Sequence, residues 1–217
     1  MRTPLSIVLP VLNEAGLIES SLGALQELRA QGAEVIVVDG GSADATPALA
    51  AALAERVITA PRGRASQMNA GARVSRGEVL LFLHADTRLP RDALEAITAG
   101  LRASDRGWGR FDVVIEAKSP LLRVIAAMMN ARSRLTGIAT GDQAIFVQRA
   151  AFDAVGGFPD IPLMEDVALS KALKRQSPPL CLRDRVVTSA RRWKRNGAIR
   201  TIILMWRLRL AYALGAD

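Results

Sequence analysis

The chain has 217 residues, with 29 Lys and Arg against 21 Asp and Glu and a formal net charge of +8. Residues 183–217 hold nine basic and two acidic side chains, whereas residues 1–182 hold 20 and 19 and are nearly neutral. A nucleic-acid-coating protein spreads its basic residues over the contact surface, so this distribution argues against that class. The length and the 50% of hydrophobic residues indicate one globular domain with its own core.

The cysteine count and the first residues bear on the cellular compartment. Cys181 is the only cysteine, which excludes an intrachain disulfide and a cysteine-based zinc cluster. The start of the chain lacks a signal-peptide layout, and no uncharged apolar run approaches the ~18–20 residues that cross a bilayer. We expect a cytoplasmic protein and leave open an association with the inner face of the membrane.

Apolar strands and helices alternate over the first 100 residues. Strands are predicted over 6–12, 34–39, 56–59 and 78–83, and helices over 15–31, 47–55 and 65–75. Strands that are apolar throughout and separated by helices form a parallel sheet covered on both faces. The pattern therefore predicts an α/β fold that begins with a βαβαβαβ unit.

The pattern changes after residue 107. Strands are predicted over 111–116, 144–148 and 185–189, and helices over 121–136, 150–155 and 164–175. This mixture indicates a second half with its own sheet geometry, packed against the first. We expect one domain over 1–190, divided into halves 1–100 and 101–190, followed by a basic amphipathic tail over 191–217.

Polar residues follow three of the predicted strands. They are Asn13-Glu14, Asp39-Gly40-Gly41-Ser42 and His84-Ala85-Asp86. One such ending could be a simple helix cap, but ligands of open parallel sheets bind at the carboxyl ends of the strands. Three polar endings at one sheet edge therefore favour a binding site.

A glycine-rich phosphate loop is missing from the sequence. The dinucleotide fingerprint G-x-G-x-x-G should follow the first strand, where the chain instead has Asn13-Glu14-Ala15-Gly16, and no Walker A sequence occurs. Another group must then neutralise a bound pyrophosphate. The aspartate after the fourth strand, Asp86, points to a divalent cation that bridges carboxylate and phosphates.

Four motifs together carry a resemblance to a known family. They are Leu9-Pro10-Val11-Leu12-Asn13-Glu14, Val38-Asp39-Gly40-Gly41-Ser42-Ala43-Asp44-Ala45-Thr46, His84-Ala85-Asp86 and Met164-Glu165-Asp166. In order and spacing the chain resembles a family-2 glycosyltransferase over about residues 5–175. The Leu-His-Ala-Asp-Thr ending is further similar to a small bacterial subgroup associated with arsenosugar biosynthesis. The resemblance implies the GT-A fold, a Rossmann-like, mostly parallel sheet flanked by helices, with a smaller mixed acceptor-side half.

The resemblance also implies which residues hold the donor, a UDP- or GDP-sugar. These are Pro10, Asn13, Glu14, Asp39, Gly41, Ser42, Arg64, Gln67 and Asn69. Asp142 is assigned to the donor sugar or the acceptor. Asp86 corresponds to the last residue of the family's D-x-D motif and should bind Mg²⁺ or Mn²⁺. His84 replaces the first aspartate, as a metal ligand, a ribose contact or a packed strand-end residue.

Glu165 and Asp166 are the expected catalytic pair. They open a predicted helix, where carboxylates are also favoured as simple partners of the helix dipole. The resemblance makes Asp166 the general base that deprotonates an acceptor hydroxyl. Direct in-line attack on the anomeric carbon would then invert its configuration.

The basic tail begins with a second partial motif. The Q-x-x-R-W element of family members is similar to the segment Ser189-Ala190-Arg191-Arg192-Trp193, which lacks the glutamine. The missing glutamine argues against processive polymerisation. Arg192 would stabilise the diphosphate and Trp193 would stack on a sugar. A helix is expected over 199–214 and could close the core or a homodimer interface, or lie on an anionic membrane; nucleic-acid binding is the least favoured alternative.

These observations predict a metal-dependent, inverting, non-processive glycosyltransferase. It would move a sugar from a nucleoside-diphosphate sugar to a hydroxyl of a small-molecule or lipid-linked acceptor. The alternative is a non-catalytic module that binds nucleotide-sugars or regulates another protein. Nucleic acid is not an expected partner.

Overall fold

The computed structural model describes residues 4–191 together with 193, 197, 200, 201, 204, 205, 207 and 208. The strands are β1 (Leu5–Val11), β2 (Glu34–Asp39), β3 (Arg56–Thr59), β4 (Val79–Phe82), β5 (Thr87–Arg88), β6 (Trp108–Glu116), β7 (Ile145–Gln148) and β8 (Leu180–Ser189). The helices are α1 (Ile18–Gly23), α2 (Gln26–Ala30), α3 (Thr46–Ala51), α4 (Arg64–Val74), α5 (Ala93–Arg102), α6 (Pro120–Thr136), α7 (Arg149–Ala154) and α8 (Glu165–Lys174), with a 3₁₀ turn η1 at Gly141–Gln143.

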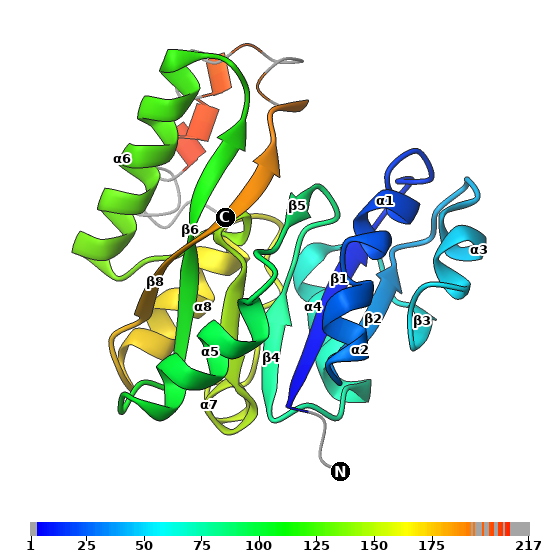
Figure 1. Cartoon of the computed structure of the whole chain (residues 1–217), viewed down its shortest axis with the longest axis horizontal. Helices are drawn as coiled ribbons and strands as arrows, with labels where there is room; N and C mark the ends of the chain where they lie inside the picture. Colours follow the sequence, from blue (N-terminus) through cyan, green and yellow to red (C-terminus); the bar gives the residue numbers. More distant parts are fainter. Residues whose placement is uncertain are drawn as a thin grey trace.

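One sheet runs through both halves of the chain (Figure 1). Within the described residues the strand order is β3-β2-β1-β4-β7-β6-β8-β5. The first four strands in sequence are parallel, β7 is antiparallel to both β4 and β6, and β8 is parallel to β6. The α/β class and the mostly parallel sheet are confirmed, while the second half extends the first sheet instead of forming another.

Helices cover both faces of the sheet because each central strand is apolar on both sides. Alternate residues of β1, such as Ile7 and Leu9, pack with α1, α2 and α5, whereas Val8 packs on the opposite face with α4. Two cores result, one on each side of the sheet.

A glycine in α4 lets this helix lie directly on the sheet. A Cβ atom on Gly71 would come within 2.9 Å of Val38 Cγ2 and still closer to Val8 Cγ1. Both valines are fully buried. The helix that starts at the carboxyl edge of the sheet is thereby held against β1 and β2.

The observed elements differ from the predicted ones at a few places. The helix expected over 15–31 divides into α1 and α2, and neither α5 nor the short β5 was predicted. The strand expected over 185–189 begins at Leu180. The helix expected over 199–214 lies largely outside the described residues. None of the helices in the described part of the chain is long and apolar enough to span a bilayer.

Candidate active site

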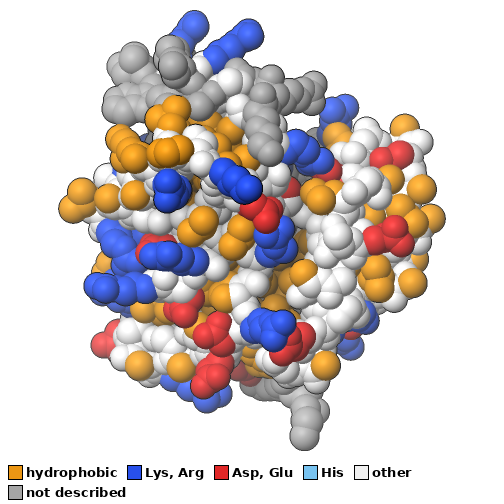
Figure 2. Space-filling model, turned by 45° about the horizontal axis from the view of Figure 1, so that its top comes forward, with side chains coloured by type: hydrophobic (Ala, Val, Ile, Leu, Met, Phe, Trp, Pro, Cys, Tyr) orange, Lys and Arg blue, Asp and Glu red, His pale blue; other side chains and the backbone are white. Residues whose placement is uncertain are grey.

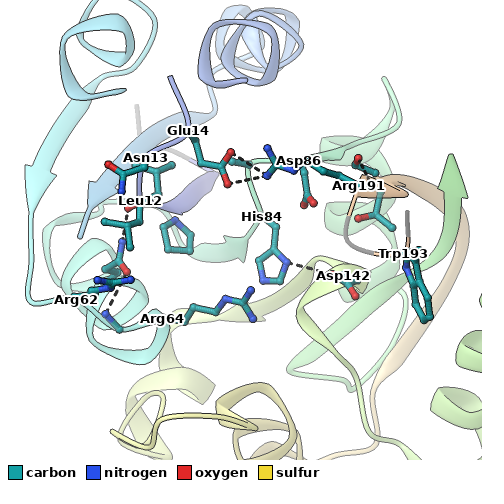
Figure 3. Close-up of a pocket in the computed structure, with 17 residues that line it drawn as sticks. Leu12, Asn13, Glu14, Arg62, Arg64, His84, Asp86, Asp142, Arg191 and Trp193 are labelled. Carbon is teal, nitrogen blue, oxygen red and sulfur yellow. Dashed lines mark hydrogen bonds and ion pairs between the residues drawn. The ribbon is translucent and has the colours of Figure 1, made fainter. Parts of the chain in front are cut away.

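A cleft of about 810 Å³ opens at the carboxyl ends of β1 and β4 (Figure 3). Its walls come from the end of β1, the start of α4, the loop after β4, η1 and the end of β8. The lining residues are Pro10, Val11, Leu12, Asn13, Glu14, Arg62, Gly63, Arg64, Gln67, His84, Ala85, Asp86, Asp142, Thr188, Ser189, Arg191 and Trp193. The structure thus brings together nine of the predicted site residues: Pro10, Asn13, Glu14, Arg64, Gln67, His84, Asp86, Asp142 and Trp193.

The end of β1 is tied to the loop that follows β2. The backbone N–H of Asn13 donates to Ser42 Oγ at 2.8 Å, and Asn13 Oδ1 accepts from the backbone N–H of Ala43 at 2.8 Å. Asn13 adopts a left-handed φ of 53°, which asparagine tolerates better than most residues. These bonds fix the turn that presents Asn13 and Glu14 to the cleft.

Asp39 stabilises the loop that follows β2. Its carboxylate is buried and accepts from the backbone N–H groups of Gly41 and Ser42, both at 2.9 Å, and from the Ser42 hydroxyl. Gly41 has a φ of 86°, which an L side chain would strain. The three residues do not line the cleft and lie behind Asn13.

The start of α4 forms another wall. Gln67 is buried, and its Nε2 donates to the carbonyls of Val11 and Val38 at 2.9 and 2.8 Å, which joins α4 to β1 and β2. Arg64, by contrast, has a half-exposed side chain that extends towards His84 in Figure 3. The first turn of α4 therefore contributes to the cleft both an amide held by the backbone, Gln67, and a half-exposed cation, Arg64.

Asn69 lies away from the cleft. Its side chain exchanges two hydrogen bonds with the backbone of Phe158, at 2.8 and 2.9 Å. Phe158 follows the turn at Gly156 and Gly157 after the end of α7, where the two glycines have φ angles of 78° and 79°. In this structure Asn69 thus connects α4 to the segment that leads into α8.

His84, Asp86 and Asp142 face the cleft from the loop after β4 and from η1. His84 Nδ1 lies 3.3 Å from Asp142 Oδ1, and Figure 3 shows this pair beside Asp86. The loop is held by its backbone, since Ser189 N–H donates to the Asp86 carbonyl at 3.0 Å. Within the described residues the Asp86 carboxylate has no hydrogen bond or ion pair to the protein.

The side chains of His84, Asp86 and Asp142 suit a metal ion only when a bound ligand supplies further coordinating atoms. No group of three or more His, Cys, Asp and Glu side chains within the described residues could enclose a metal ion. Mg²⁺ and Mn²⁺, however, are commonly held by one or two carboxylates together with substrate phosphates and water. A carboxylate that has no partner among the described residues, on the wall of a large cleft, fits that arrangement.

Glu165 and Asp166 sit at the start of α8, as predicted, beside His84 in a smaller cavity next to the main cleft. Asp166 is partly exposed and accepts from the backbone N–H groups of Gly141 at 2.8 Å and Val167 at 2.7 Å. Glu165 is buried, with Arg64 Nη1 4.0 Å from its carboxylate. Burial, and next the negative charge of Asp166, raise the pKa of Glu165.

The end of β8 closes the cleft opposite β1. Arg191 Nη2 lies 2.9 and 3.0 Å from the two carboxylate oxygens of Glu14, and Figure 3 shows this pair across the cleft. Trp193 is nearly buried against Leu122 and Ile125 of α6 and presents one edge to the cleft. Arg192 lies outside the described residues.

Two cleft cations were not predicted from the sequence. Arg62 lines the cleft next to Arg64, and Arg191 pairs with Glu14, although the motif comparison pointed only to the neighbouring Arg192. The signal for both was present as a second arginine within two positions of a predicted one. Which of two neighbouring arginines faces the cleft depends on the local backbone, and the sequence does not contain that information.

Comparisons with known proteins agree on the family. The model of "Glycosyl transferase family 2" matches residues 6–147. The chain is 28% identical over 189 residues to the "Probable glycosyltransferase YdaM" of Bacillus subtilis (strain 168), covering 76% of this chain and 45% of that protein. The chain therefore spans less than half the length of this relative.

Two solved structures are similar in fold. The mannosyltransferase PcManGT from Pyrobaculum calidifontis, solved with GDP-Man and Mn²⁺, superposes with a TM-score of 0.64 at 25% identity, over 86% of this chain and 57% of that one. S. aureus TarS 1-349, solved with UDP-GlcNAc, gives a TM-score of 0.70 at 17% identity, over 87% and 59%. With a family model that matches most of its length and a fold of the GT-A type, the chain belongs to glycosyltransferase family 2.

Proposed function

We propose that the protein transfers a sugar from a nucleoside-diphosphate sugar to a hydroxyl acceptor, with inversion and without processive polymerisation. The observation that carries this proposal is the convergence of Asn13, Arg64 and Asp86 on one large cleft in a family-2 chain. Their amide, cation and carboxylate match the base or ribose, the diphosphate and a bridging metal. The sugar-nucleotides in the PcManGT and TarS structures are consistent with a UDP- or GDP-sugar donor.

A divalent cation, Mg²⁺ or Mn²⁺, would supply positive charge to the departing diphosphate. Asp86 would hold it, with His84 as the neighbouring candidate ligand. The pairing of His84 Nδ1 with Asp142 fixes the ring orientation, and Nε2 lies against Gly141. Arg64 and Arg191 contribute further cations at the cleft wall.

Asp166 is proposed as the general base. Both of its oxygens accept backbone N–H bonds and it sits in the first turn of α8, two features that orient and stabilise the carboxylate. Glu165 beside it is buried, so this end of α8 is partly shielded from solvent. A base that removes the acceptor proton on the side opposite the leaving diphosphate gives inversion in a single displacement.

The acceptor and the location of the protein are proposed at a coarser level. A hydroxyl on a small molecule or on a lipid-linked carrier suits a cleft bounded by the edge of Trp193. The proposed setting is the cytoplasm or the inner face of the membrane, with homodimerisation as a further proposal for the tail.

The direct test is a screen of donor hydrolysis with UDP-, GDP- and dTDP-sugars in Mn²⁺, followed by the same assay on Asp166→Asn. We expect one donor class to turn over and the variant to lose most of the rate while it still binds the nucleotide. Full turnover by Asp166→Asn would overturn the base assignment. Nucleotide binding without turnover of any donor, in the presence of varied hydroxyl acceptors, would favour the non-catalytic module.

A further inference from the structure

The outer face of α6 carries an apolar stripe. The side chains of Leu121, Val124, Met128 and Leu135 are 46%, 56%, 61% and 87% exposed. They are four of the six large hydrophobic side chains that are exposed in the described part of the chain. Such a concentration on one helix differs from the scattered apolar residues that any protein surface shows.

The stripe is regular and lies on a different face of the helix from the packed residues. Its positions are three, four and seven residues apart, so they share one side over roughly 21 Å of helix. The buried face, with Leu122 and Ile125, instead contacts Ile115 and Trp193. Since α6 is already anchored to the core through this face, the stripe is not needed to hold the helix in place.

The charge around the stripe decides between candidate occupants. α6 contains Arg123, Arg132 and Arg134 and no acidic residue. Arg134 lies against Asp112, whereas Arg123 is exposed and forms no ion pair within the described residues. In Figure 2 hydrophobic side chains and Lys or Arg side chains gather on the side of the molecule where Figure 1 places α6.

A second copy of this helix is a poor occupant. Two such helices placed face to face would bring together two copies of Arg123, and α6 has no carboxylate to neutralise them. An anionic bilayer offers both an apolar layer for the stripe and negative charge for Arg123. Amphipathic helices with basic flanks bind membranes in this orientation, with their apolar side at the boundary between headgroups and acyl chains.

We infer that the stripe of Leu121, Val124, Met128 and Leu135 docks the protein on an anionic lipid surface. Because Trp193 lies between α6 and the cleft, docking would set that edge of the cleft on the membrane side of the molecule. The inference concerns attachment and does not depend on the proposed reaction. It also differs from an attachment through the basic tail, because the residues lie in the domain itself.

Vesicle co-sedimentation tests the inference on the full chain. Vesicles of equal parts phosphatidylglycerol and phosphatidylcholine are compared with pure phosphatidylcholine, for the parent, for Val124→Gln/Met128→Gln and for Arg123→Glu. The parent should bind the anionic vesicles, and the binding should weaken from about 0.1 M to about 0.5 M NaCl as screening increases. Each variant should bind at least about tenfold more weakly.

Control variants carry changes of the same kind elsewhere on the surface. Leu163→Gln replaces another exposed leucine. Arg91→Glu makes the same change in net charge just before the start of α5, where the Arg91 side chain is 92% exposed. Both should bind like the parent. Circular dichroism and nucleotide binding without vesicles should be unchanged in every variant, which separates loss of docking from misfolding or from failure of the proposed function.

Three results would overturn the inference. One is a parent that does not bind anionic vesicles. Another is undiminished binding by the α6 variants, which would place any attachment in the tail. The third is a dimer in solution that Val124→Gln/Met128→Gln converts to a monomer, which would make the stripe an interface between two copies.

Discussion

Replacement of Gly71 by alanine tests how α4 is seated on the sheet. The new methyl group would come within 2.9 Å of Val38 Cγ2 and closer to Val8 Cγ1, whereas ordinary contacts begin near 3.4 Å. Both partners are β-branched, fully buried and stiff at χ1, so the helix must move away. Overpacking of this kind costs about 2–3 kcal/mol, and the better helix propensity of alanine returns about 1.

The expected net loss is therefore about 1–2 kcal/mol, or roughly 2–8 °C in Tm for a domain of this size. Urea unfolding followed by circular dichroism measures it. Gly23→Ala in α1 is the matched control, because a Cβ there would meet nothing within 4 Å, and it should be neutral or stabilise by up to about 1 kcal/mol. Equal stability of Gly71→Ala and the parent would refute the packing argument. A displaced α4 should also weaken nucleotide binding through Arg64.

Three further substitutions have defined outcomes. Burial raises the pKa of the Glu165 carboxyl above its ordinary value of 4.5. The parent should therefore lose stability relative to Glu165→Gln as the pH rises from the ordinary pKa through the raised pKa. Urea unfolding at pH 4 and pH 8 should show the variant more stable than the parent only at pH 8. Burial also raises the pKa of Glu34, but the hydrogen bonds from Ser6 and Arg76 outweigh it and leave the pKa below 4.5. Glu34→Gln should therefore cost about 2–4 kcal/mol at pH 7, with the difference shrinking as the pH falls through the lowered pKa, and a constant difference would contradict this sign. Gly141→Ala would place a Cβ 2.5 Å from His84 Cε1 and displace the ring. Calorimetry should show Mn²⁺-dependent nucleotide binding weakened about tenfold, with little change in Tm. A large loss of Tm would mean that the ring has no room to move.

The parallel half of the fold was predictable because its strands are apolar throughout. β2 and β3 fall at their predicted bounds, since each is preceded and followed by clear breaks in the pattern. The direction and order of β6, β7 and β8 were not predictable. Strand pairing in a mixed sheet depends on contacts between distant segments, and β8 lies between β6 and β5 although it is last in the sequence.

The candidate site followed the same division. Strand ends place Asn13, His84 and Asp86 at one edge by topology alone, and the structure brings all three to the cleft. The direction in which each side chain points was not predictable from the sequence. Asp39 binds the backbone N–H groups of the turn that follows it, and Asn69 binds the backbone of the distant Phe158, so neither side chain lines the cleft.

Calorimetric titration of UDP and GDP in the presence and absence of Mn²⁺ tests the central claim most directly. The parent should bind at least one of the two, more tightly with the metal, and Asp86→Asn should lose most of the gain from Mn²⁺ while its thermal stability stays close to that of the parent. Absence of binding by either nucleotide, or an Asp86→Asn variant with the full effect of Mn²⁺, would contradict the account.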